Sequence, residues 1–159
     1  MKFFVISGAE DTGKTTILNH IGNWLTEVKG YKDVGEITPV FFERDEQGKI
    51  KDIYYVLTNN FLKVITISAT DDEECLNILL EALKIHADAD IVITTCRDIH
   101  DPRSYFINHV KPKSSFYLEV PVAKVNRRNE EYKKESLEWY YDSVFNLSRY
   151  ILETDDFRV

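Results

Sequence analysis

The sequence reads Gly8-Ala9-Glu10-Asp11-Thr12-Gly13-Lys14-Thr15 directly after its first apolar run, and this segment has the form G-x-x-x-x-G-K-[ST]. The preceding run, residues 2–7, is almost continuously apolar, as is typical of a strand buried on both faces of a parallel sheet. From Lys14 onward apolar residues recur at helical spacing as far as Val28, and Gly30 is placed to end that helix. The segment therefore predicts a strand, a glycine-containing loop and a helix in succession.

This loop has the chemistry needed to hold phosphate groups. Gly8 and Gly13 permit backbone angles that let successive amides point inward, and the amino terminus of a helix adds partial positive charge. Lys14 offers a point charge to the β and γ phosphates, and the Thr15 hydroxyl is suited to bind Mg²⁺. We therefore expect a nucleoside triphosphate, ATP or another, to bind with Mg²⁺ to Gly8, Ala9, Glu10, Asp11, Thr12, Gly13, Lys14, Thr15 and Thr16.

The motif, set between a strand and a helix, resembles the P-loop NTPase superfamily, whose Walker A motif it matches within residues 1–28. The resemblance implies an αβα sandwich, Mg-dependent triphosphate binding, and usually hydrolysis or phosphoryl transfer. Regulatory GTPases carry an N/TKxD motif that this sequence lacks, and residues 45–48 match their DxxG motif in letters only. The chain is therefore closest in character to small nucleoside and nucleotide kinases, and its branch of the superfamily stays open.

Extended segments are expected next, over residues 37–44, 50–58 and 61–69. Turn-forming residues separate them at 45–49 and at Asn59-Asn60, so the pattern predicts two linked hairpins. Thr70 and Glu73 then have the spacing of a capping box, which predicts a helix that runs to about His86.

The rest of the chain alternates between strands and helices. A buried strand is expected over residues 90–95, and Asp101-Pro102 is expected to open a short helix that ends before Pro112. A further strand over residues 115–120 precedes a last helix over residues 129–152, whose expected core stripe is Leu137, Tyr140, Tyr141, Val144, Leu147 and Ile151, with Trp139 also assigned to the helical core. This order predicts an α/β fold, a three-layer αβα sandwich in one domain (1–159) with a mainly parallel sheet and an antiparallel hairpin extension.

Phosphoryl transfer needs a carboxylate near the metal, usually at the carboxyl end of a central strand. Asp98 follows the strand expected at 90–95 and is our first candidate for a metal ligand. Asp71 and Asp72 follow another expected strand and are its rivals. Each has a structural alternative, since Asp98 could bond local backbone and the pair could stabilise a helix amino terminus.

Basic residues supply candidates for gripping a phosphoryl group. Arg97 and Arg103 flank the loop after the central strand, where either could act in bidentate fashion or simply be solvated. Glu43-Arg44 could be a base and a clamp, or the exposed end of a hairpin. A basic cluster in the position of a kinase lid, or on an ordinary solvated helix face, comprises Lys124, Arg127, Arg128, Lys133 and Lys134.

Composition narrows the classes of partner. The net charge of −7 repels polyanions, so nucleic acid is not expected as a partner, and no apolar run is long enough to span a membrane. Cys75 and Cys96 have no CxxC spacing and are expected to be reduced thiols in a cytoplasmic protein. Cys96, Asp98, His100 and Asp101 lie close together but lack a zinc spacing.

The sequence thus favours an ATP-dependent phosphotransferase acting on a small acceptor that bears a hydroxyl or a phosphate. Lys14, Arg97, Asp98 and Arg103 are its expected catalytic residues, with Thr15 and Asp98 on the metal. Two alternatives stay open: a nucleotide-dependent switch that docks a protein partner on its hairpins, and a domain that binds nucleotide without chemistry.

Overall fold

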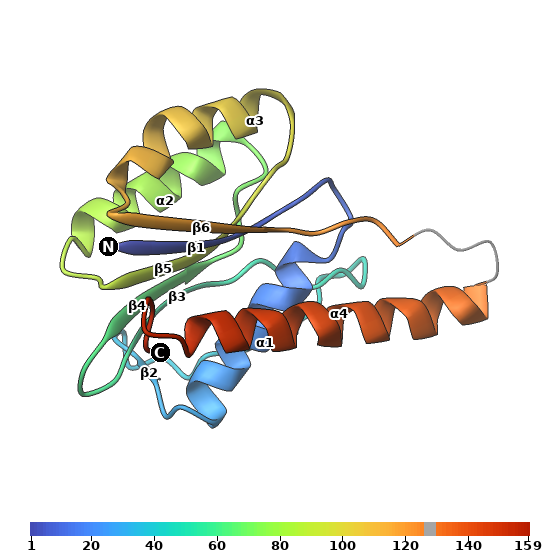
Figure 1. Ribbon diagram of the computed structural model, residues 1–159, viewed down its shortest axis with the longest axis horizontal. Coiled ribbons are helices and arrows are strands. Elements are labelled where there is room, and N and C mark those ends of the chain that lie inside the picture. Colours follow the sequence, from blue (N-terminus) through green and yellow to red (C-terminus); the bar gives the residue numbers. More distant parts are fainter. Residues whose placement is uncertain (126–129) are drawn as a thin grey trace.

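The computed structural model describes residues 1–125 and 130–159, and within them the centre is a six-stranded mixed sheet in the order β2-β3-β4-β5-β1-β6 (Figure 1). The strands are β1 (Lys2–Ser7), β2 (Lys32–Asp33), β3 (Tyr54–Thr58), β4 (Lys63–Ile67), β5 (Ile91–Cys96) and β6 (Phe116–Pro121). The predicted α/β class is therefore confirmed.

Four neighbouring strands, β4, β5, β1 and β6, run parallel, and β1 lies between β5 and β6. Ser7 is in register with both Cys96 and Pro121, so three strands end side by side. The loops that follow these strands are consequently brought to one edge of the sheet. This edge includes the glycine-containing loop after β1.

Helices cover both faces of the sheet (Figure 1). On one face lie α1 (Lys14–Glu27) and α4 (Glu130–Leu152), and on the other lie α2 (Glu73–Ile85) and α3 (His100–Tyr105). Successive residues of β1 alternate between the two cores, with Phe4 and Ile6 facing α1 and Phe3 and Val5 facing α2. No helix in the described ranges is long and apolar enough to cross a membrane.

The prediction of a strand over residues 37–44 is wrong, and the first hairpin is reduced to a short antiparallel turn over residues 43–51. β2 at the sheet edge contains two residues, Lys32–Asp33. The chain then passes over α1, where the Phe41 ring packs so closely that a Cβ on Gly22 would lie 2.3 Å from it. The expected turn at 45–49 does form, closed by the bridge between Arg44 and Ile50.

The second hairpin is confirmed, with β3 and β4 antiparallel about Asn59-Asn60. The amino terminus of α2 differs from the prediction, because Asp72 caps it by accepting the Cys75 amide at 2.8 Å. The Thr70 hydroxyl instead bonds the Thr95 hydroxyl in the interior. These are local changes that leave the element order intact.

The later helices also differ in detail. Ile99, not Asp101, is the N-cap of α3, and the helical run continues through a π-helical turn (Phe106–Val110) and a 3-10 turn (Lys111–Lys113) that contains Pro112. In α4 the core prediction is wrong for two residues, since Leu147 is 49% exposed and Trp139 is 71% exposed. Trp24 in α1, by contrast, is only 6% exposed.

Candidate functional site

The loop between β1 and α1 has a backbone that requires glycine at two positions. Gly13 is the N-cap of α1 with φ 83°, and a Cβ there would lie 2.2 Å from the Tyr141 ring of α4. A Cβ on Gly8 would lie 2.6 Å from the Val122 carbonyl oxygen. No side chain among the described residues caps the start of α1, so its first amides remain available to an anion.

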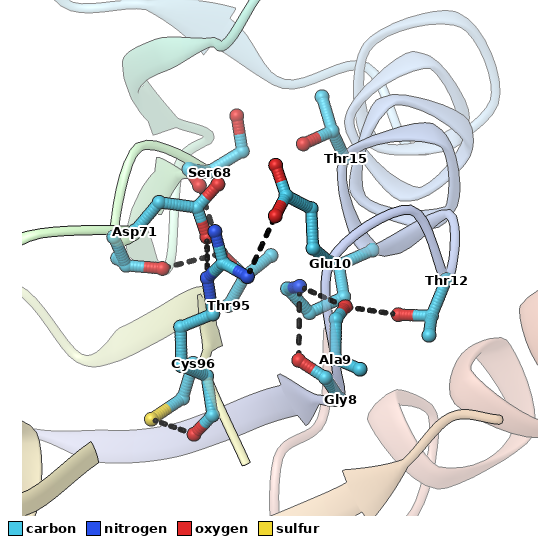
Figure 2. A network of polar contacts seen from close by, with 12 residues as sticks. Gly8, Ala9, Glu10, Thr12, Thr15, Ser68, Asp71, Thr95 and Cys96 are labelled. Carbon is cyan, nitrogen blue, oxygen red and sulfur yellow. Dashed lines mark hydrogen bonds and ion pairs between the residues drawn. The ribbon is translucent and has the colours of Figure 1, made fainter. Parts of the chain in front are cut away.

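Lys14 is held inside this loop. Its Nζ donates to the carbonyl oxygens of Gly8 at 3.0 Å and Ala9 at 2.8 Å, bonds that Figure 2 draws beside the one from Thr12 to Ala9. Lys14 is 7% exposed, and burial lowers the pKa of its ammonium group, although the nearby Asp71 and Asp98 charges oppose that effect. The Lys14 ammonium group is thus held beside the uncapped amino terminus of α1.

Asp52 is the carboxylate that contacts the loop, and our sequence analysis missed it. The Thr15 hydroxyl donates to Asp52 Oδ1 at 3.2 Å, and the Ser68 hydroxyl donates to the same oxygen at 2.8 Å. Asp52 lies in a segment that matched only a strand pattern, with no motif around it. It lies three residues beyond the 45–49 turn, and no local pattern marks it as a partner of Thr15.

Arg97 links the loop to the neighbouring strand end. Its Nε lies 2.8 Å from Asp71 Oδ1, and its second nitrogen, Nη1, lies 3.6 Å from Glu10 Oε2 (Figure 2). Arg97 and Asp71 were both predicted near the phosphates, and the structure brings them together. Asp72 instead stabilises the amino terminus of α2, which was the structural alternative for it. Hydrogen bonds from backbone amides at the start of α2 lower the pKa of its carboxyl group.

Asp98 is exposed beyond the end of β5 and acts on Lys14 through its charge. Asp98 is not among the described residues that line the polar cavity over the loop, whereas Asp52 is one of them. The role of Asp98 as a metal ligand therefore stays a prediction.

Arg103 lies on α3, and its side chain reaches Glu119 of β6. It forms a bidentate ion pair with Glu119, at 2.9 and 3.1 Å, and the Tyr117 hydroxyl also donates to Glu119, at 2.6 Å. Burial works against a charged Glu119, but the hydrogen bonds from Arg103, Ser7 and Tyr117 outweigh it, so the pKa of Glu119 is lowered. This pairing gives Arg103 a structural role, and its catalytic role stays a prediction.

A cavity of about 390 Å³, within the size range of ligand sites, opens over the loop. Its walls combine four carboxylates, three cations and several hydroxyls, and they comprise Glu10, Asp11, Thr12, Gly13, Lys14, Thr15, Thr16, Arg44, Lys49, Ile50, Asp52, Ser68, Asp71 and Tyr141. A larger cavity, of about 730 Å³, lies between α2 and the segment 108–113. We assign the site to the smaller one because its polar groups converge on a helix amino terminus.

The other candidates are less informative. Glu43, the possible base, forms an ion pair with Lys51 at 2.7 Å. Of the predicted basic lid, Arg127 and Arg128 lie outside the described residues, as does the side chain of His100.

The described part of the chain contains no group of three metal-binding side chains. Burial raises the pKa values of the Cys75 and Cys96 thiols to about 11.

No family model, curated protein or solved structure matches the chain. The fold and the cavity therefore define the class of protein. It is an α/β protein with a six-stranded mixed sheet in its described part and a polar cavity where its parallel strands end.

Proposed function

We propose that the loop at residues 8–16 binds a nucleoside triphosphate with Mg²⁺, in the manner of a P-loop NTPase with a three-layer sandwich. We further propose that the chain transfers the γ-phosphoryl group to a small acceptor. One observation carries this proposal: α1 starts at a left-handed Gly13 without a side-chain cap, and the Lys14 ammonium lies beside it in a ligand-sized cavity. Free amides, a helix dipole and a buried cation together favour a polyphosphate.

The residues present also suit Mg²⁺. This ion prefers oxygen ligands and is commonly held by one or two protein groups together with phosphates and water. The Thr15 hydroxyl and Asp52 Oδ1 are 3.2 Å apart at the cavity wall and would be those groups. The bound ion would neutralise charge between the β and γ phosphates.

The chain's own groups then have separate tasks. Lys14 exchanges its bonds to Gly8 and Ala9 for bonds to phosphate oxygens, and it neutralises negative charge that develops on the transferred group. The amides of the loop orient the β phosphate, and Arg97 can leave Glu10 for a phosphate oxygen because that contact is the longer of its two. The fold thus offers positioning and charge, which are the main requirements of phosphoryl transfer.

Calorimetry with MgATP tests the proposal, after thermal shifts with ATP and GTP have identified the preferred triphosphate. Lys14→Ala should lower the affinity at least ~30-fold, equivalent to about 2 kcal/mol. Asp52→Asn should lower it only when Mg²⁺ is present. Lys84→Ala, which removes an exposed lysine on α2, is the matched control, and undiminished affinity in the Lys14 variant would refute the site.

A nucleotide-dependent switch is the second candidate, favoured by the segment 34–42. Val34, Ile37 and Val40 are exposed there, and the segment is tied through Asn19 to the first turn of α1. A partner could bind these side chains and sense the nucleotide. Labelled ATP separates the two candidates, because label reaches an acceptor in a kinase, whereas a switch releases free phosphate only when its partner is added.

A further inference from the structure

Residues 43–51, here called the arm, stand outside the sheet. One antiparallel bridge, between Arg44 and Ile50, closes the arm. The Asp45 carboxylate stabilises the turn by accepting hydrogen bonds from the backbone amides of Gln47 and Lys49. The arm contributes nothing to the strand ladder of the sheet. Strand pairing in the sheet therefore does not explain where the arm lies.

Both ends of the arm are fixed to the beginning of α1. At one end, the fully buried Asn19 accepts the Phe42 amide at 2.9 Å while its own amide group donates to the Thr15 carbonyl at 2.8 Å. At the other end, Asp52 accepts the Thr15 hydroxyl. Phe42 adopts a φ of 61°, which is costly for a bulky residue and persists where surrounding contacts enforce it.

This attachment sets two cations of the arm against the cavity. Arg44 and Lys49 both line it, facing the residues of the glycine loop. Arg44 Nη1 donates to the Gly48 carbonyl at 2.6 Å, which fixes the guanidinium. Within the described residues neither cation pairs with a carboxylate, whereas the neighbouring Lys51 is paired with Glu43. Because no ion pair in the described part of the chain neutralises them, both side chains can donate charge-assisted hydrogen bonds to an anionic group of a ligand.

The carboxylates at the ends of the arm bear on the type of acceptor. A hydroxyl acceptor must lose a proton to a base during transfer. Glu43 is already paired with Lys51, and Asp52 already accepts two hydroxyls. Of the other carboxylates in the cavity wall, Glu10 and Asp71 both contact Arg97, and Asp11 lies in the glycine loop, which the triphosphate would occupy. A phosphate monoester needs no base, because its second pKa is near 6 and its oxygens are already deprotonated at neutral pH.

We infer that the acceptor carries a phosphate group and that Arg44 and Lys49 bind this group, an inference that rests on the proposed function. An oxygen of the acceptor phosphate forms a bond to the γ-phosphorus. The bond from that phosphorus to the β–γ bridging oxygen breaks, and its electron pair leaves with the nucleoside diphosphate. The products are a nucleoside diphosphate and an acceptor with one further phosphate, and no proton changes place.

The test uses the full chain saturated with Mg²⁺ and a non-hydrolysable ATP analogue, with inorganic phosphate as the probe for the second site. Phosphorus NMR titrations measure phosphate affinity, and calorimetry measures analogue affinity in the same variants. Arg44→Gln and Lys49→Gln should each weaken phosphate binding at least ~5-fold, as expected for loss of a charge-assisted hydrogen bond. Analogue affinity should change less than ~2-fold. Lys51→Gln removes a charge from the same arm outside the cavity lining, and it should change neither value.

Three results would overturn the inference. The saturated wild-type complex could fail to bind phosphate, Lys51→Gln could weaken phosphate binding as much as the other two changes, or Arg44→Gln and Lys49→Gln could weaken the analogue instead. The last result would assign the arm to the triphosphate. Each of these leaves analogue binding in the wild type intact, so the proposed function survives; absence of analogue binding to the wild type would reject both.

Discussion

Gly13 and Gly30 have similar backbone angles but different surroundings. Both lie in the left-handed region, with φ values of 83° and 71°. A Cβ on Gly30 would meet nothing within 4 Å, whereas a Cβ on Gly13 would collide with the Tyr141 ring. The pair therefore separates the cost of backbone strain from the cost of steric overlap.

Gly30→Ala is expected to lower the free energy of unfolding by about 1 kcal/mol, the usual cost of a left-handed alanine. Gly13→Ala should lower it by a further ~1–3 kcal/mol, because Tyr141 must move. Adding Tyr141→Ala to the Gly13 variant removes the overlap and provides the control. Urea denaturation measures all four proteins, and equal losses in the two alanine variants would contradict the steric explanation.

At individual positions the sequence predicted the loop better than its surroundings. Lys14, Thr15 and the two glycines belong to a contiguous motif, so their spacing alone indicated where they lie. Asp52 belongs to no motif, and it reaches Thr15 only because residues 34–53 pass over α1. That path depends on side-chain packing between distant segments, which local patterns do not record.

At the scale of elements, residues 37–44 illustrate why a strand pattern can fail. Ile37, Val40, Phe41 and Phe42 have strong strand propensity, but propensity mainly reports how well a side chain packs on a half-buried surface. Phe41 packs on α1 and on Tyr55, with 5.5 Å between the centroids of the two rings, whereas Ile37 and Val40 remain exposed. By contrast, the strands β1 and β5 lie inside the sheet, and for them pattern and packing agree.

Asn19→Ala is expected to release the arm, because it removes both the acceptor for Phe42 and the donor to Thr15. We expect a loss of about 2 kcal/mol in the free energy of unfolding and faster tryptic cleavage at Arg44, Lys49 and Lys51. Limited proteolysis followed by mass spectrometry locates the cuts.

Asn23→Ala is the matched control, since Asn23 lies on the same helix and its half-buried side chain bonds only Glu27 among the described residues. Its effect on stability should stay within about 0.5 kcal/mol. Cleavage of the arm at equal rates in the two variants would mean that Asn19 does not hold it.

At the scale of the whole molecule, His20 joins three parts that are distant in the sequence. Its ring lies on α1, 4.7 Å from the Phe42 ring at the root of the arm and 5.6 Å from the Phe145 ring of α4. Burial lowers the pKa of His20 below 6.5, although the Asp142 charge opposes this shift. The folded state therefore favours the neutral imidazole.

Because the folded pKa lies below the unfolded value of 6.5, the contribution of His20 to stability is complete above pH 6.5 and is lost as the pH falls through the folded pKa. Wild type should lose more stability than His20→Gln between about pH 7 and about pH 5, a range above the usual carboxylate pKa values. Urea denaturation across this range measures the difference. Parallel profiles for the two proteins would exclude His20 as the titrating group.

The contrast between the two tryptophans gives the molecule a built-in pair of optical reporters. Trp24 is shielded between α1 and the sheet and carries Lys29 over its ring at 5.1 Å, whereas Trp139 stands out from α4 into solvent. A water-soluble quencher such as acrylamide therefore reaches Trp139 in the native protein and leaves the emission of Trp24 largely intact. Fluorescence that remains under quencher then follows the interior beneath the carboxyl-terminal half of α1, without any label attached.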